Sequence, residues 1–125
     1  MSATSSEAVI CLGSNVDFRR FNIDSALDRL SDVCDVIKST GIYETEADNH
    51  KDAPFFNLVM RCRCRLSLDD MLRRCKELEI RAGRRPDSKA TGIMPLDVDI
   101  IVWDGRVIDE RQYAKPYFTL GYNKL

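Results

Sequence analysis

The sequence has a single histidine, His50, among its 125 residues, so it offers little material for sites that depend on imidazole. It has five cysteines, but Cys62 and Cys64 are separated by one residue, a spacing typical of neither a C-x-x-C redox pair nor a zinc knuckle. A zinc site is therefore hard to assemble, and Cys/His nucleophilic catalysis is not favoured. We expect the cysteines to serve as small buried hydrophobic residues in a reducing compartment.

Long apolar segments and an excess of one charge are also missing. No apolar run approaches the roughly 20 residues that a membrane-spanning helix needs. The opening segment MSATSSEAV has neither the basic region nor the long apolar region of a secretory signal. The formal net charge is −1, so no overall basic field favours nucleic acid. We therefore expect a cytoplasmic protein with no membrane and no nucleic-acid partner.

The composition is that of one folded domain, residues 1–125. Hydrophobic residues make up 44% of the chain and charged residues 31%. A chain of this length can close one hydrophobic core but has no room for two.

Hydrophobic periodicity predicts strands and helices in a definite order. Strands are expected at residues 8–12, 36–45, 55–65 and 96–103, and helices on the apolar stripe between Ile23 and Val33 and from Ser67 to Ala82. The order predicts an α+β protein with a ferredoxin-like βαββαβ fold, in which two helices cover one face of a four-stranded antiparallel sheet. Asp104-Gly105 predicts a short C-terminal hairpin to residues 106–108. The segment 84–95 is expected to be irregular.

Alternation along two of these strands predicts which side chains share a face. In 55–65 the even-numbered residues from Phe56 to Cys64 point one way, and in 96–103 the residues Leu96, Val98, Ile100 and Val102 do. The opposite face is then left open for a ligand or a partner. It carries Phe55, Asn57, Asp97 and Asp99.

Asp97 and Asp99 are the first candidates for chemistry. Two residues apart on a strand, their carboxylates project from the same face and repel each other unless a cation lies between them. Mg²⁺ commonly takes one or two carboxylates together with water and phosphate oxygens. The alternative is an acidic, solvated face on an edge strand, and the spacing alone does not separate the two.

Basic and acidic residues are segregated along the chain. Residues 61–85 hold nine Lys/Arg against four Asp/Glu, whereas residues 97–110 hold five Asp/Glu against one Arg. Acids that hold metal next to arginines that hold phosphate suit polyphosphate transfer. The alternative is that most of these arginines form a solvated face. Beside them, Phe55 and Asn57 could stack on and hydrogen-bond a flat heterocycle.

Five short segments follow one another along the chain: LGSN from Leu12, YET from Tyr43, PFFN from Pro54, the ELE segment with GR from Glu77 to Arg84, and LDVDII from Leu96. Taken in this order, they resemble those of the 6-hydroxymethyl-7,8-dihydropterin pyrophosphokinase family of folate biosynthesis. The resemblance covers nearly the whole chain. It implies transfer of pyrophosphate from ATP to the pterin hydroxymethyl group, leaving AMP.

The resemblance also implies roles for individual residues. Asp97 and Asp99 match the family aspartates that hold Mg²⁺ against ATP, and Arg84 joins them as a catalytic residue. Asn57, Phe55, Thr45, Tyr43 and Asn15 match positions on the pterin side. Glu79, Arg84 and the neighbouring Arg85 match the ATP side.

Departures from the family pattern keep a second hypothesis open. Met94 stands where the family has a phosphate-facing arginine, Pro86 where it has the second arginine of R-x-R, and Tyr117 where it has a histidine. Family members also continue beyond the position of Leu125. The chain is thus predicted to be a divergent enzyme with reduced activity, or a non-catalytic pterin- or nucleotide-binding or assembly module. Self-association is left open.

Overall fold

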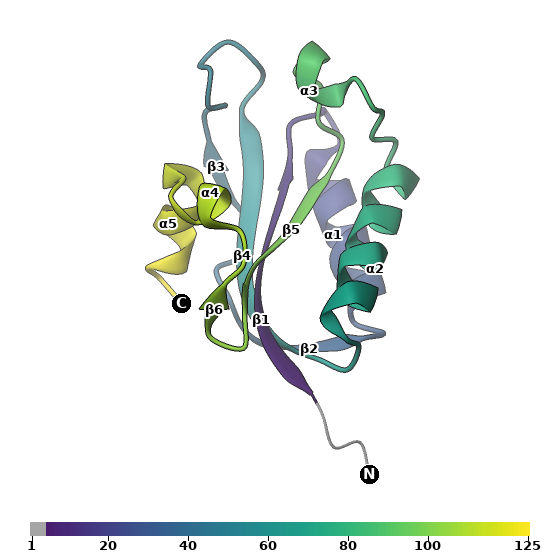
Figure 1. The fold of residues 1–125 in the computed structure, drawn as a ribbon. Coiled ribbons are helices and arrows are strands. Elements are labelled where there is room, and N and C mark those ends of the chain that lie inside the picture. The colour runs from purple at the N-terminus through teal and green to yellow at the C-terminus, as the bar shows by residue number, and fades with distance from the viewer. Residues whose placement is uncertain (1–4) are drawn as a thin grey trace.

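The computed structural model describes residues 5–125, which form a twisted sheet with helices on both faces (Figure 1). The elements, in chain order, are β1 (Ser6–Ser14), α1 (Arg19–Leu30), β2 (Cys34–Ser39), β3 (Tyr43–Thr45), β4 (Phe55–Cys64), α2 (Leu68–Arg81), α3 (Ser88–Thr91), β5 (Asp97–Trp103), β6 (Arg106–Val107), α4 (Glu110–Tyr113) and α5 (Pro116–Tyr122). In these residues no helix is long and apolar enough to cross a membrane.

The sheet has the order β2-β4-β1-β5-β6, with β3 also paired to β4, and every pairing is antiparallel. The predicted α+β class is therefore confirmed, but the sheet has six strands rather than four. The expected strand at 36–45 is divided into β2 and β3 because Gly41 turns the chain with a φ of 76°. The predicted hairpin is confirmed: β5 and β6 pair on either side of Asp104-Gly105.

The main core lies between the sheet and the two long helices, α1 and α2. From the sheet it takes the residues that alternation along β4 placed on this face, together with residues of β1 and β5. Helix α2 begins directly after Ser67, whose hydroxyl caps it by accepting a hydrogen bond from the Asp70 backbone N–H at 3.2 Å. Both helices therefore cover one face of the sheet, as predicted.

The other face of the sheet is not open along its whole length, which corrects the prediction. Helices α4 and α5 lie against it, on the side away from α1 and α2 (Figure 1). Phe118 of α5 is fully buried and packs with Val9, Cys11, Val59 and Ile101. These two helices have four and seven residues, which is too short for a helical period to be recognised in the sequence. The end of this face near Asp97 stays accessible, and at the opposite end of β4 Arg63 is exposed.

A β-bulge changes the face of the last residues of β5. Val9 pairs with Val102 while the next residue, Ile10, pairs with Ile100, so Ile101 is an extra residue in β5. Val102 therefore packs on the α5 side and Trp103 on the α1–α2 side. The prediction that Val102 shares a face with Val98 and Ile100 was wrong for this reason.

The segment 84–95 is not entirely irregular either. It contains the single-turn helix α3, which ends at Gly92 with a φ of 74°. A Cβ at Gly92 would collide with the side-chain carboxylate of Asp52, so the glycine lets this segment approach the loop 46–54. Figure 1 shows the two segments facing each other at one end of the sheet.

The packing of α5 gives a prediction about stability. Phe118→Ala should lower the free energy of unfolding by about 3–5 kcal/mol, because it removes a fully buried ring from the core under α5. Leu120→Ala, on the same helix but 50% exposed, should change it by less than about 1 kcal/mol. Urea unfolding measures both. Equal losses in the two variants would contradict this account of α5.

Candidate active site

The register of three neighbouring strands brings the chemistry-bearing residues into one row. Gly13 of β1 pairs with Asn57 of β4 on one side and with Asp97 of β5 on the other. Two residues along, Cys11 pairs with Val59 and Asp99. An added Cβ at Gly13 would lie 3.4 Å from Oδ1 of Asn57 and 3.5 Å from the Phe55 ring. The missing side chain therefore leaves a trough between Asn57 and Asp97.

This trough opens into a cavity of about 300 Å³. Its floor is the sheet, and its walls are the loop 46–54, the segment around α3, and the start of α5. The lining residues are Cys11, Gly13, Thr45, Glu46, Ala47, Asp48, Asp52, Phe55, Asn57, Ser88, Lys89, Gly92, Met94, Asp97, Asp99 and Tyr117. The cavity thus combines both predicted groups of site residues, the Asn57 group and the Asp97 group.

One end of the cavity is acidic. Carboxylate oxygens of Glu79, Asp97 and Asp99 lie within 4.8 Å of one another. Arg84 bridges two of them, with Nη1 at 2.8 Å from Glu79 Oε2 and 3.0 Å from Asp97 Oδ1. The same Glu79 oxygen accepts a hydrogen bond from the Val98 backbone N–H at 2.8 Å, which joins the end of α2 to β5. Predicted residues from three segments therefore meet here.

These carboxyl groups are electrostatically frustrated. Burial, followed by the charge of Asp97, raises the pKa of Asp99 from 3.8 to about 8. Burial also raises the pKa of Glu79 to about 7, an effect that the Val98 N–H and the Arg84 guanidinium oppose. A cation among these oxygens would favour their ionised forms. The set of hard oxygen donors suits Mg²⁺ rather than a softer metal.

The other end of the cavity is polar and aromatic. Asn57 is buried, and its Nδ2 donates a hydrogen bond to Thr45 Oγ1 at 2.7 Å. This bond fixes the amide while its Oδ1 faces the trough at Gly13. Phe55 lies beside it on β4 and presents a ring to the cavity. A planar heterocycle with an amide-like edge matches such a combination of ring and amide.

Asn15 hydrogen-bonds to both the loop 46–54 and the segment around α3, which form two walls of the cavity. Its Nδ2 donates to the carbonyls of Gly92 at 2.8 Å and Ala53 at 3.3 Å, and its Oδ1 accepts from the Met94 N–H at 2.7 Å. Asn15 does not line the cavity itself. It fixes the backbone at Met94, whose side chain does line the cavity and is buried.

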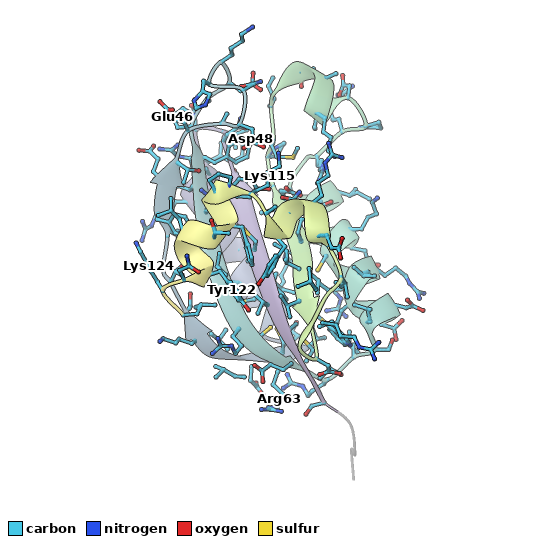
Figure 2. All side chains as sticks on the ribbon, turned by 60° about the vertical axis from the view of Figure 1, so that its left-hand side comes forward. Glu46, Asp48, Arg63, Lys115, Tyr122 and Lys124 are labelled. Atoms are coloured by element: carbon cyan, nitrogen blue, oxygen red, sulfur yellow. The ribbon has the colours of Figure 1, made fainter. Side chains whose placement is uncertain are left out.

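Tyr43, like Asn15, lies behind the site rather than in its wall. Its hydroxyl donates to the Tyr117 carbonyl at 2.6 Å and thereby holds the start of α5, while the Tyr117 side chain lines the cavity. Lys115 adds a second link, with Nζ 3.0 Å from Asp48 Oδ2. Figure 2 shows Asp48 and Lys115 close together where the loop meets the C-terminal helices.

After Arg84, the segment 84–95 carries two further basic residues, Arg85 and Lys89, and they differ in their position relative to the cavity. The Arg85 side chain lies beside Asp87 at 3.6 Å, is 79% exposed and does not line the cavity. Lys89 of α3 does line it. Lys89 and Gly13 line the cavity although the sequence motifs assigned them no role. Gly13 could have been found by pairing the predicted strands and looking for a small residue on the central strand that has polar partners on both neighbouring strands.

Residues 9–122 match the family model described as 7,8-dihydro-6-hydroxymethylpterin-pyrophosphokinase (HPPK). The chain belongs to this family. It is 35% identical over 104 residues to a folate synthesis bifunctional protein of Arabidopsis thaliana, and 28% identical over 107 residues to the 2-amino-4-hydroxy-6-hydroxymethyldihydropteridine pyrophosphokinase of Aquifex aeolicus. It is also 29% identical over 116 residues to the folic acid synthesis protein fol1 of Schizosaccharomyces pombe.

The matches cover most of this chain but a smaller part of these relatives. They span 82%, 85% and 90% of the chain, against 22% of the Arabidopsis protein, 66% of the Aquifex protein and 16% of the Schizosaccharomyces protein. The predicted HPPK resemblance is confirmed at the level of the family.

The raised pKa of Asp99 gives a prediction about pH. The folded protein holds a proton on Asp99 up to about pH 8, whereas the unfolded chain loses it near 3.8. Protonated Asp99 therefore contributes to the free energy of unfolding. This contribution is complete below about pH 4 and is lost as the pH rises through 8. In EDTA, Asp99→Asn should therefore gain stability relative to wild type between pH 5 and pH 9, as urea unfolding measures.

The matched control is Asp69→Asn, an exposed aspartate in the first turn of α2. Its stability difference from wild type should stay constant over the same pH range. If the stability difference between Asp99→Asn and wild type were also constant with pH, the raised pKa of Asp99 would be contradicted.

Proposed function

We propose that this chain transfers pyrophosphate from ATP to the hydroxymethyl group of 6-hydroxymethyl-7,8-dihydropterin. The hydroxymethyl oxygen attacks the β-phosphorus and loses its proton to solvent, the bond from that phosphorus to the α-phosphate oxygen breaks, and AMP leaves. The observation that carries the proposal is the single cavity that joins Asn57 and Phe55 to Asp97 and Asp99 across Gly13. We also assign the core from β1 to β5 to the ferredoxin-like fold, with residues 1–125 as one domain.

At the polar and aromatic end, Asn57 recognises the pterin. Its Oδ1 accepts from the amide-like edge of the ring, and its orientation is held by the hydrogen bond to Thr45. Phe55 stacks on the ring face. Because Gly13 carries no side chain, the ring can reach over β1 with its hydroxymethyl group directed toward β5.

At the acidic end, the three carboxylates fit Mg²⁺. Their oxygens lie within 4.8 Å of one another, and burial together with the charge of Asp97 raises the pKa of Glu79 and of Asp99, so a bound cation would favour their ionised forms. Asp97 and Asp99 would hold the ion, which would supply neutralisation of the ATP phosphates when bound. Arg84, whose Nη1 lies 3.0 Å from Asp97 Oδ1, would contact the phosphates from beside these carboxylates.

The cavity has few basic side chains to meet the negative charge of the ATP phosphates. Lys89 lines the cavity, but Met94 and Pro86 stand where the family has arginines. Cations that meet charge developing in phosphoryl transfer are commonly worth factors of 10³ or more in rate. The proposed enzyme is therefore slow, with binding better preserved than turnover.

AMP formation from ATP, Mg²⁺ and the pterin tests the proposal, together with calorimetric binding of each ligand. Asp97→Asn should abolish AMP formation and the Mg²⁺ dependence of ATP binding. Asn57→Ala should weaken pterin binding by at least about tenfold, because it removes the polar partner of the ring edge. Asp69→Asn and Asn123→Ala, both exposed and remote from the cavity, are the matched controls.

The outcomes separate the proposed enzyme from a binding module. Metal-dependent ATP binding and pterin binding without any AMP would contradict the transferase and support a non-catalytic module. Failure of the chain to bind either ligand would contradict both.

Met94→Arg tests the explanation for the slow rate. Asn15 fixes the backbone at Met94 through two hydrogen bonds, at 2.7 and 3.0 Å, so a longer side chain there enters the cavity. We expect AMP formation to rise by at least about tenfold, with pterin affinity unchanged. A fully folded variant with no gain in rate would show that Lys89 already fills the role of the lost arginine.

A further inference from the structure

Three cysteines gather at the far end of the sheet from the cavity. Cys34 begins β2, and Cys62 and Cys64 lie near the end of β4. Their sulfur atoms lie within 4.8 Å of one another, and Sγ of Cys62 is 3.8 Å from Sγ of Cys64. All three thiols are free and buried. Arg63, which lies between the two β4 cysteines in sequence, is at the opposite end of the molecule from Asp48 (Figure 2).

The strand register produces this cluster. Cys62 and Cys64 are two residues apart on β4, so they face the same side, and Cys34 is the direct partner of Cys64 on β2. The odd spacing that matched no motif in one dimension therefore creates three adjacent sulfurs in the fold.

The surrounding backbone holds Cys34 in place. Arg65 donates from its side chain to the carbonyls of Ser31 and Asp32, at 3.3 and 3.1 Å, and from its backbone N–H to Val33 at 2.9 Å. The thiol of Cys34 itself donates to the Leu30 carbonyl at 3.2 Å. The turn that carries Cys34 is thus tied to the end of β4 that carries Cys64, which preorganises the three sulfurs.

Three cysteine sulfurs are soft ligands, and a site with only three of them favours a soft metal ion of low coordination number. Three sulfurs in one plane around a metal at about 2.3 Å are separated by about 4 Å. The distance of 3.8 Å between the Cys62 and Cys64 sulfurs is close to this value, and the Cys34 sulfur lies within 4.8 Å of both. Structural zinc sites almost always have four protein ligands, and no fourth Cys, His, Asp or Glu in residues 5–125 joins this group. Soft thiolates select Cu(I). We propose that Cys34, Cys62 and Cys64 bind one Cu(I) ion as three thiolate ligands.

This site is independent of the proposed transferase. Cys34 is the first residue of β2, a strand at the edge of the sheet whose residues 35–39 are exposed. Local opening of an edge strand costs less than opening of the core, so the thiols can be reached without disrupting the cavity.

The test is an anaerobic titration in which the chain competes for Cu(I) with a coloured chelator. Wild type should take up one Cu(I) per chain, and X-ray absorption should show three sulfurs at about 2.3 Å. Cys62→Ala and Cys34→Ala should lower the apparent affinity by at least about 100-fold, since each removes a direct ligand. Cys75→Ala, a buried cysteine of α2 outside the cluster, is the matched control and should behave as wild type.

Several results would overturn the proposal. Wild-type chain that takes no Cu(I) from the chelator would show that these thiols serve only as small hydrophobic residues. Fewer than three sulfur ligands, tighter binding of Zn²⁺ than of Cu(I), or an equal loss in Cys75→Ala would each contradict a three-thiolate site. The absorption measurement on wild type decides the matter even where an alanine variant fails to fold.

Discussion

The arrangement of the candidate active site depends on the pairing of β1 with β4 on one side and β5 on the other. Gly13 stands between Asn57 and Asp97 in this register, and it has no side chain to separate them. Neighbouring strands lie about 4.8 Å apart, so the two outer residues are about 10 Å apart across the trough. That span suits a heterocycle at one end and metal-bound phosphates at the other. A slip of one residue in either pairing would turn these side chains to the helix face.

Packing on both faces of the sheet preserves this register. Helices α1 and α2 bury one face, and Phe118 of α5 buries part of the other. The buried hydrogen bond that the Val98 backbone N–H donates to Glu79 then fixes the start of β5, and the bond that the Tyr43 hydroxyl donates to the Tyr117 carbonyl fixes the start of α5. The cavity lies at the start of α5, where the layer formed by α4 and α5 ends. Helix α5 therefore both stabilises the sheet, through Phe118, and forms one wall of the site, through Tyr117.

Much of this could be predicted from the sequence, and the failures have identifiable physical causes. Strict alternation along β4 and the apolar stripes of two helices were sufficient for the α+β class and for the helix-covered face. The face of Val102 was predicted wrongly because a bulge at Ile101 has no signature in the alternation. The open face was overestimated because α4 and α5 are too short to show a helical period. Gly13 was undervalued because its importance comes from its partners on β4 and β5.

The most direct test of the central claim is the distance from the metal site to the bound pterin. Mn²⁺ can replace Mg²⁺ in a complex with a non-hydrolysable ATP analogue, and its unpaired electrons relax nearby nuclei. If the pterin lies across Gly13, relaxation of its hydroxymethyl protons will place them within about 10 Å of the ion, the span of two strand spacings. The effect should disappear in Asp97→Asn. Pterin protons unaffected by Mn²⁺ in a complex that contains both ligands would contradict the account.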